Sequence, residues 1–199
     1  MVMRILALLV GYGFGIIQAA YIIGKIRGID VKNSGSGNLG TTNALRTMGS
    51  SAGLLVFIID VAKAVAAFWL SYNLFGGIVF AMYAGFGVIL GHCFPFYLKF
   101  KGGKGIASYV GILFCIHILM ASTILAVGVA FLIITKYMSL TSLIIVTISP
   151  IFLYLYLFTT EAIIVNIATT IICFIMHKGN ISRLLHGTER RLSFGGEKE

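Results

Sequence analysis

The stretch Gly91–Ala107, GHCFPFYLKFKGGKGIA, combines residue types that bind phosphate in proteins. Lys104 follows Gly102 and Gly103 and precedes another glycine. Glycine lets backbone N–H groups approach a ligand closely, and a lysine adds three charged donors. We therefore expect a phosphate site in this stretch. A basic loop that only orients a membrane protein fits the same residues, and the GxxxxGK[ST] order of a nucleotide-binding loop is absent.

A second polar stretch, SGSGNLGTTNALR, runs from Ser34 to Arg46 within a polar loop over 25–51. Its hydroxyls, side-chain amides and glycines offer many donors to an oxyanion, and an arginine binds such a group bidentately. A flexible connecting loop is the alternative interpretation. The residues in this loop that we expect at a substrate are Ser36, Gly37, Asn38, Thr42, Asn43 and Arg46.

Two shorter polar motifs occur later in the chain. In KYMSLTS, Ser139 and Ser142 are three residues apart, so they either cap the next helix or point into the site. In MHKGNISRLL, His177, Asn180 and Arg183 recur at helical spacing. His177 alternatively lies at a helix end in the membrane interface.

The composition is that of a membrane protein. Of the 199 residues, 59% are hydrophobic and only 11% are charged, about half the charged share of a soluble domain. The apolar runs are long enough for helices that cross a bilayer, which takes about 20 residues each. The short alternating segments of a membrane β-barrel are not visible. We predict an all-α, polytopic integral membrane protein with a single membrane domain over 1–199.

The apolar runs predict seven transmembrane helices. The expected spans are about 5–23, 52–74, 78–98, two short spans within 106–135 that turn near 117–122, 140–157 and 162–176. The fourth run is divided because one helix over 106–135 would be about 45 Å long, against a hydrocarbon core of about 30 Å.

Charge asymmetry orients these spans. Of the 15 Lys and Arg residues, all but Arg4 and Lys63 then fall on one side, which the positive-inside rule makes cytoplasmic. The N-terminus is therefore expected outside and the C-terminus inside. The cytoplasmic side carries the loop 25–51, the basic Gly-rich loop 99–105 and the polar tail 178–199, of which the part beyond His186 is expected to be loosely ordered.

Asp60 and Lys63 lie inside the second predicted span, three residues apart and on one helical face. Charges at membrane depth are costly unless they are paired or face a wet cavity. We expect a mutual pair that helps to shape the site. Direct chemistry by Asp60 is the alternative.

The residue inventory excludes several familiar chemistries. The only aspartates are Asp30 and Asp60, which leaves no ligand set for an Asp-rich magnesium site. No HxxxxD sequence occurs, and a Ser-His-Asp triad on a nucleophile elbow is unsupported. The three cysteines lack metal-ligand spacing. We expect no metal, no cofactor and, because the basic residues sit between spans, no nucleic-acid partner.

The four motifs, in this order across seven predicted spans, resemble the bacterial acyl-phosphate:glycerol-3-phosphate acyltransferases of the PlsY type. The resemblance covers residues 1–190 and implies a multi-pass enzyme of the bacterial cell membrane with its active site at the cytoplasmic face. Such an enzyme transfers a fatty acyl group from acyl phosphate to the sn-1 hydroxyl of glycerol 3-phosphate, giving lysophosphatidate and phosphate. The implied partners are these two substrates, membrane lipid and the soluble enzyme that makes acyl phosphate.

The resemblance also implies roles for residues at matching motif positions. It makes Ser36, Arg46 and Lys104 catalytic. The residues that it implies for substrate binding are Gly37, Asn38, Thr42, Asn43, His92, Gly102, Gly103, Ser142, His177 and Asn180. On the residues alone a packing role is favoured for His92. The family's last motif usually reads Arg-His-Arg-Glu-Asn, whereas this chain has MHKGN over 176–180, so no role for that glutamate can be transferred.

A rival interpretation is a membrane transporter of phosphate-like anions. Such a protein would have an inverted repeat and a basic site near the bilayer midplane, and neither is visible in the sequence. A non-enzymatic membrane scaffold would leave the clustered Gly, Asn and Thr residues unexplained. No general base stands out among the residues, which agrees with a substrate phosphate accepting the proton.

Overall fold

The apolar runs form a bundle of helices in the computed structural model, which describes residues 1–192; residues 193–199 of the predicted tail lie outside the described part. All regular elements over 1–192 are helical. The six longer helices are α1 (Val2–Gly15), α4 (Ser50–Phe75), α5 (Ile78–Cys93), α7 (Ile118–Thr135), α8 (Met138–Leu155) and α9 (Thr160–Met176). The five shorter ones are α2 (Ala19–Ile26), α3 (Thr41–Met48), the 3₁₀ turn η1 (Phe96–Leu98), α6 (Ile106–Ile116) and α10 (Lys178–Leu185).

Length and composition identify the membrane-crossing parts of this bundle. Five stretches of 1–192 are long and apolar enough to span a bilayer, or six if the bent pair α9 and α10 is one span. The prediction of an all-α, multi-pass membrane protein is thereby confirmed. Helix α6 is apolar but has only 11 residues, or about 16 Å, which is roughly half of a hydrocarbon core.

The first apolar run is not the continuous helix that its composition predicts, because it breaks between α1 and α2. A break at membrane depth leaves backbone carbonyls that other groups must satisfy. The hydroxyl of Tyr97 donates to the carbonyl of Ile16 at 2.8 Å. The ammonium of Lys63 donates to the carbonyl of Ile17 at 2.7 Å. The break therefore provides two backbone acceptors to donors from other parts of the chain.

Small residues allow α1 and α5 to pack closely along their lengths. Gly11 and Gly15 on α1 face the backbone of α5, and Gly87 and Gly91 on α5 face the backbone of α1. A Cβ atom at any of these four positions would lie under 3.0 Å from backbone atoms of the other helix. Two interlocking GxxxG sequences thus replace side-chain packing with backbone contact, as is common between membrane helices.

The third predicted span, 78–98, is not helical throughout in one piece: α5 ends at Cys93, two residues before Pro95, and the turn η1 follows. The predicted division of the run 106–135 is confirmed. The run 106–135 divides at His117, which has extended backbone angles and accepts a hydrogen bond from the Met120 N–H on its Nδ1 at 3.2 Å. The run therefore forms two separate helices, α6 and α7, as the sequence predicted.

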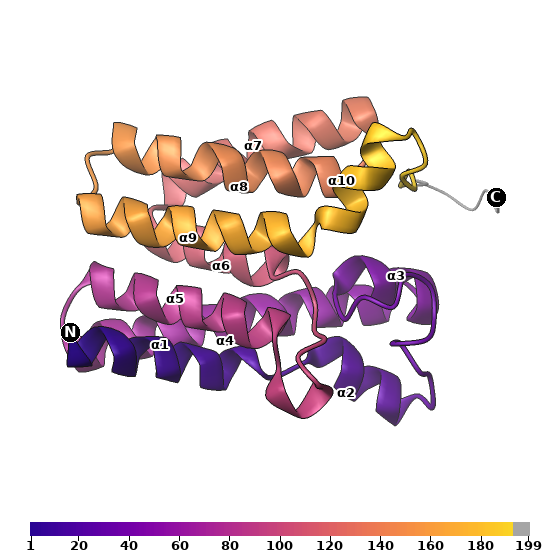
Figure 1. Ribbon diagram of the computed structural model, residues 1–199, viewed down its shortest axis with the longest axis horizontal. Helices are drawn as coiled ribbons and strands as arrows, with labels where there is room; N and C mark the ends of the chain where they lie inside the picture. Colours follow the sequence, from indigo (N-terminus) through magenta and orange to yellow (C-terminus); the bar gives the residue numbers. More distant parts are fainter. Residues whose placement is uncertain (193–199) are drawn as a thin grey trace.

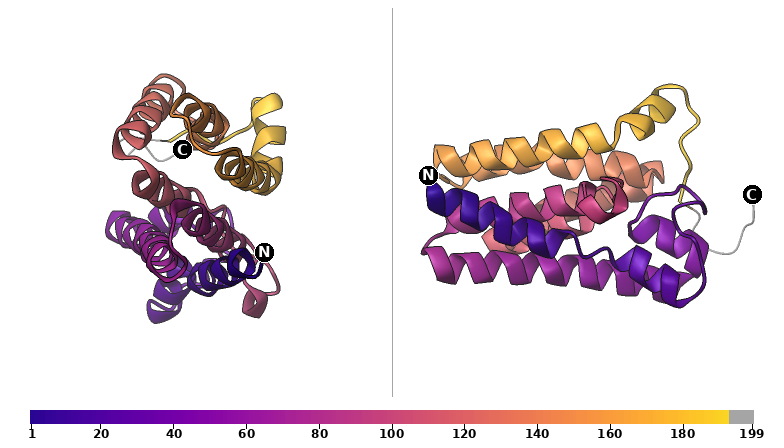
Figure 2. Two further views of the ribbon diagram at one scale, coloured as in Figure 1. Left: turned by 90° about the vertical axis from the view of Figure 1, so that its left-hand side faces the viewer. Right: turned by 60° about the horizontal axis from the view of Figure 1, so that its bottom comes forward.

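The polar segments gather at one end of the bundle (Figure 1), where α3, α10 and the loop between α5 and α6 lie together on the right. The N-terminus and the turns before α5 and α9 lie at the opposite end, which the second view of Figure 2 also shows. Arg4 lies at this opposite end and forms an ion pair with Glu161, to which the hydroxyl of Tyr83 also donates at 3.1 Å. Arg4, which is an exception to the charge asymmetry, therefore has a local partner in Glu161.

Candidate active site

The Gly-rich loop folds back onto the C-terminal end of α5. The N–H of Gly102 donates to the carbonyl of Cys93 and the N–H of Gly103 donates to that of His92, both at 3.0 Å. A Cβ on either glycine would lie under 3.0 Å from atoms of His92. The N–H groups of these two glycines are therefore already hydrogen-bonded within the protein. The loop contributes to the site by positioning Lys104.

Lys104 connects the Gly-rich loop with the last polar motif. Its ammonium donates to the Oδ1 atom of Asn180, which is 76 residues away in the chain. Burial lowers the pKa of the half-buried Lys104 to about 8; Glu189 raises this pKa, and the nearby cations Arg183 and Arg46 lower it further. Lys104 is therefore a charged donor below about pH 8 and loses its proton as the pH rises through this value.

The first loop is shaped by a single buried amide. Asn43 is 1% exposed, and its Oδ1 atom accepts from the N–H of Ser36 at 2.8 Å. Its Nδ2 atom donates to the carbonyls of Val31 and Ser34 at 3.2 and 3.1 Å. The hydrogen-bonding capacity of Asn43 is thus directed into the loop, and the residue holds Ser36 in an exposed turn.

Arg46 lies in the last turn of α3 at the same end of the molecule. Burial lowers the pKa of its guanidinium, as do Arg190 and Arg183, whereas Glu189 raises it. The first loop also meets the Gly-rich loop, because a Cβ on Gly103 would lie 2.9 Å from the carbonyl of Leu39. The structure therefore brings Arg46 and Lys104 to one cationic region. Other predicted residues of the first loop are half-buried around the start of α3, namely Gly37, Asn38 and Thr42.

The last motif contributes two buried polar side chains from the junction of α9 and α10. His177 is 2% exposed, and its Nδ1 atom lies 2.8 Å from the carbonyl of Cys173, to which it donates. The neutral ring then keeps Nε2 as an acceptor. Asn180 is 8% exposed, and its Nδ2 atom donates to Glu189 at 2.6 Å.

The two serines at the start of α8 do not cap this helix. The N-cap residue is Tyr137, and no side chain makes a cap hydrogen bond there. Ser142 instead donates to the carbonyl of Met138 at 2.9 Å, and Ser139 donates to the carboxylate of Glu189 at 2.8 Å. The capping interpretation is therefore wrong for both, and Ser139 is the serine whose hydroxyl reaches this polar cluster.

Glu189 was missed by sequence reasoning, which expected a loosely ordered tail after His186. Residues 187–192 form a strap that is hydrogen-bonded to the rest of the protein, and Glu189 within it has a side chain only 8% exposed. Its carboxylate accepts from Ser139, Asn180 and Arg183. A signal was available, since this is one of only 6 acidic residues in the chain and two arginines follow it directly.

The predicted pair of Asp60 and Lys63 is confirmed and extends to His92. The ammonium of Lys63 donates to Asp60 Oδ1 and to the carbonyl of Ile17, both at 2.7 Å, and lies 2.8 Å from His92 Nδ1. An ammonium has three hydrogens, so this set uses all of them. The neutral ring of His92 then carries its hydrogen on Nε2, the atom nearest a Cβ built on Gly103. The buried pair of Asp60 and Lys63 thus holds His92, whose ring lies against Gly103 of the Gly-rich loop.

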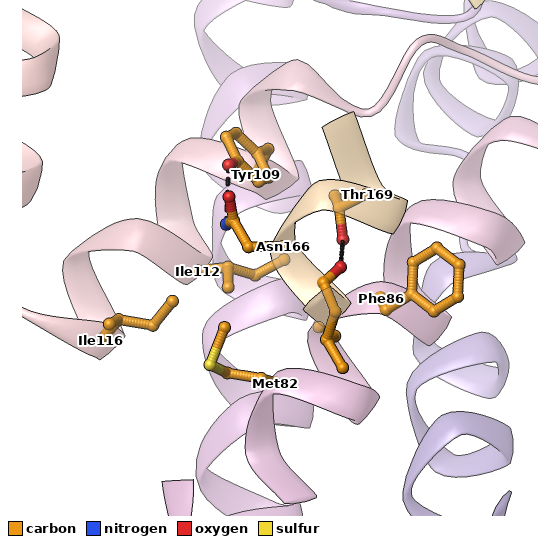
Figure 3. A pocket seen from close by; sticks show the side chains of 9 residues that line it. Met82, Phe86, Tyr109, Ile112, Ile116, Asn166 and Thr169 are labelled. Atoms are coloured by element: carbon orange, nitrogen blue, oxygen red, sulfur yellow. Dashed lines mark hydrogen bonds between the residues drawn. The ribbon is translucent and has the colours of Figure 1, made fainter. Parts of the chain in front are cut away.

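A small cavity lies deeper in the bundle, between α5, α6 and α9 (Figure 3). It is lined by Met82, Gly85, Phe86, Tyr109, Ile112, Ile116, Val165, Asn166 and Thr169. The amide of Asn166 donates to the hydroxyl of Tyr109 at 2.9 Å, and Thr169 donates to a carbonyl of its own helix. None of these lining residues is charged, so this cavity offers no cation to a phosphate.

The helical bundle and its cationic, amide-bearing end define an integral membrane protein with a site suited to phosphate-bearing molecules. The sequence profile of the family described as glycerol-3-phosphate acyltransferase matches residues 5–187. The chain belongs to this family of membrane enzymes, which confirms the resemblance seen in its motifs.

Individual relatives agree with this assignment. The chain is 37% identical over 187 residues to a glycerol-3-phosphate acyltransferase of Thermosipho melanesiensis, with 94% of this chain and 92% of the relative covered. It is 41% identical over 192 residues to the enzyme of the same description from a Thermoanaerobacter species, with 94% and 95% covered.

Solved structures agree as well. The crystal structure of PlsY, an integral membrane glycerol 3-phosphate acyltransferase, in its glycerol 3-phosphate form superposes with a TM-score of 0.90 at 30% identity and covers 96% of both chains. The lysophosphatidic acid form of PlsY gives a TM-score of 0.88 at 29% identity, with 96% of this chain and 95% of that one covered.

Proposed function

We propose that this chain transfers a fatty acyl group from acyl phosphate to the sn-1 hydroxyl of glycerol 3-phosphate, giving lysophosphatidate and phosphate. The observation that carries the proposal is the hydrogen bond between Lys104 and Asn180. It joins the Gly-rich loop to the last motif, next to the region that holds Arg46. Both substrates carry phosphate, and a cluster of cations and amides matches that chemistry.

Each predicted site residue has a role in this proposal. Lys104 and Arg46 offset the charge of the two phosphates, with Arg46 binding bidentately. The exposed hydroxyl of Ser36 and the amide of Asn180 donate to phosphate oxygens. His177, whose Nδ1 is held by a backbone carbonyl, presents Nε2 to a glycerol hydroxyl. The remaining substrate-binding residues of the prediction shape the loops around these groups.

The chemistry needs orientation more than a dedicated nucleophile. Acyl phosphate is an activated mixed anhydride, so attack of the sn-1 oxygen on its carbonyl carbon expels phosphate as a good leaving group. Aligning the two substrates and stabilising the oxyanion then supply the catalysis. The proton of the hydroxyl passes to a phosphate oxygen of the substrate. Glu189 is a poor alternative base because three donors already engage its carboxylate.

The proposal places the site at the cytoplasmic face of the bacterial cell membrane. Counting α1 with α2 as one span and α6 as a short one gives seven spans, with the N-terminus outside and the C-terminus inside. The charge asymmetry supports this orientation, as does the local pairing of Arg4 with Glu161. The soluble enzyme that makes acyl phosphate is then a partner on the same side.

The geometry does not favour an anion transporter. Such a protein would bind its anion near the midplane, on groups freed by broken helices. Here the buried cation Lys63 has three acceptors of its own, and the deeper cavity is lined without a charged residue.

The test is an activity assay on the purified full-length protein in detergent. Incubation with acyl phosphate and labelled glycerol 3-phosphate should yield labelled lysophosphatidate. Replacing the donor by acyl-CoA should yield none. A product formed from acyl-CoA at an equal rate would overturn the choice of donor, and the absence of product from acyl phosphate would overturn the proposed function. Uptake of phosphate into proteoliposomes without acyl transfer would support the transporter.

A further inference from the structure

The strap 187–192 holds an acidic side chain against the residues that form the site. Gly187 adopts a positive φ of 69° directly after α10, which turns the chain back. The N–H of Thr188 donates to the carbonyl of Arg183 at 2.8 Å, and the N–H of Leu192 donates to that of Lys136 at 2.7 Å. Backbone hydrogen bonds therefore hold the strap on both sides of Glu189.

The carboxylate of Glu189 gathers donors from two helices. Its Oε1 atom accepts from Ser139 on α8 at 2.8 Å and from Asn180 on α10 at 2.6 Å. Its Oε2 atom accepts from Arg183 Nε at 2.7 Å. Hydrogen bonds to an ionised acceptor are shorter and stronger than neutral ones. The side chain is therefore tightly located, and so are the groups that donate to it.

This arrangement determines which way the amide of Asn180 faces. An ionised carboxylate only accepts hydrogen bonds, so the amide must turn its NH₂ group toward Glu189. Its oxygen then faces Lys104, whose ammonium only donates. With the amide reversed, two donors would face each other at Lys104 and two acceptors at Glu189. The order Glu189, Asn180, Lys104 is thus a chain of matched donors and acceptors.

We propose that Glu189 is a positioning residue of the acyltransferase site, which orients Asn180 and through it the phosphate-binding ammonium of Lys104. This inference rests on the proposed function. Glu189 itself touches no substrate in it. The carboxylate also offsets the cations that face Lys104, namely Arg183 on α10 and Arg46 on α3, while His177 faces Lys104 from the junction of α9 and α10.

The decisive variant is Glu189→Gln, which keeps the size of the side chain but removes its charge. We expect kcat/KM for glycerol 3-phosphate to fall about tenfold or more, since hydrogen bonds to a charged group are lost. Because the carboxylate raises the pKa of Lys104, the decline of kcat/KM at alkaline pH should begin at lower pH than in the wild type. Glu161→Gln is the matched control, since it makes the same change in an ion pair at the opposite end.

A second variant separates charge from geometry. Glu189→Asp keeps the charge but shortens the reach to Asn180, so kcat/KM should fall several-fold while the alkaline decline stays near its wild-type pH. If Glu189→Gln does not accumulate as folded protein, the fall of kcat/KM in Glu189→Asp tests the positioning role in its place. A purely structural strap would lower the melting temperature without moving the pH profile.

Three results would overturn the positioning role while the wild type remains active. They are a wild-type kcat/KM in either Glu189 variant, an unshifted alkaline decline in Glu189→Gln, and an equal loss in Glu161→Gln. An inactive wild type would instead refute the proposed function, and the positioning role with it.

Discussion

Replacing Lys104 by alanine tests whether the basic Gly-rich loop binds substrate or only orients the protein in the membrane. Lys104 is half-buried and hydrogen-bonded to Asn180, whereas Lys99 and Lys101 are exposed. Truncating a buried, hydrogen-bonded charge costs about 2–5 kcal/mol. Because Lys104 keeps part of its solvent exposure, we expect the lower half of this range, about 2–3.5 kcal/mol, or about 30- to 370-fold in kcat/KM. An exposed charge is worth about 0–1 kcal/mol, so Lys99→Ala and Lys101→Ala should lose less than about fivefold.

The assay is lysophosphatidate formation from acyl phosphate and labelled glycerol 3-phosphate, with the three alanine variants compared at matched amounts of folded protein. The pH dependence provides a second readout. The pKa of Lys104 is lowered to about 8, so the ammonium is charged below this pH and is lost as the pH rises through it. The kcat/KM of the wild type should therefore fall above about pH 8, and Lys104→Ala should lack this decline. Three similar, mild losses would refute the site and leave the loop as an anchor.

Three further predictions concern the framework of the site. Asp60→Asn or Lys63→Met alone should lower the yield of folded protein more than the double variant, because each single change leaves a lone buried charge; a double variant worse than both singles would contradict the pairing. Gly87→Leu should prevent α1 and α5 from packing, and a wild-type melting temperature in that variant would show that the two helices can separate at little cost. In a background without the native cysteines, Thr160→Cys should react with an impermeant thiol reagent from outside sealed cells and Ser182→Cys should not; equal labelling would refute the proposed orientation.

The local sequence determined much of the fold, because helices and their interruptions depend on near neighbours. Continuous apolar runs predicted the membrane helices, and excess length predicted the division of 106–135 near His117. The break between α1 and α2 could not be predicted from composition. It is stable because Lys63 and Tyr97, which are distant in sequence, satisfy the exposed carbonyls.

The same division applies to the site. Residue types indicated Lys104 as a phosphate ligand, since it lies among glycines, and the resemblance of the motifs added a substrate-binding role for Asn180. The contact between them spans 76 residues, and that between Ser139 and Glu189 spans 50. Only the packing of the helices decides such contacts, because a side chain's partner depends on which distant segment lies next to it.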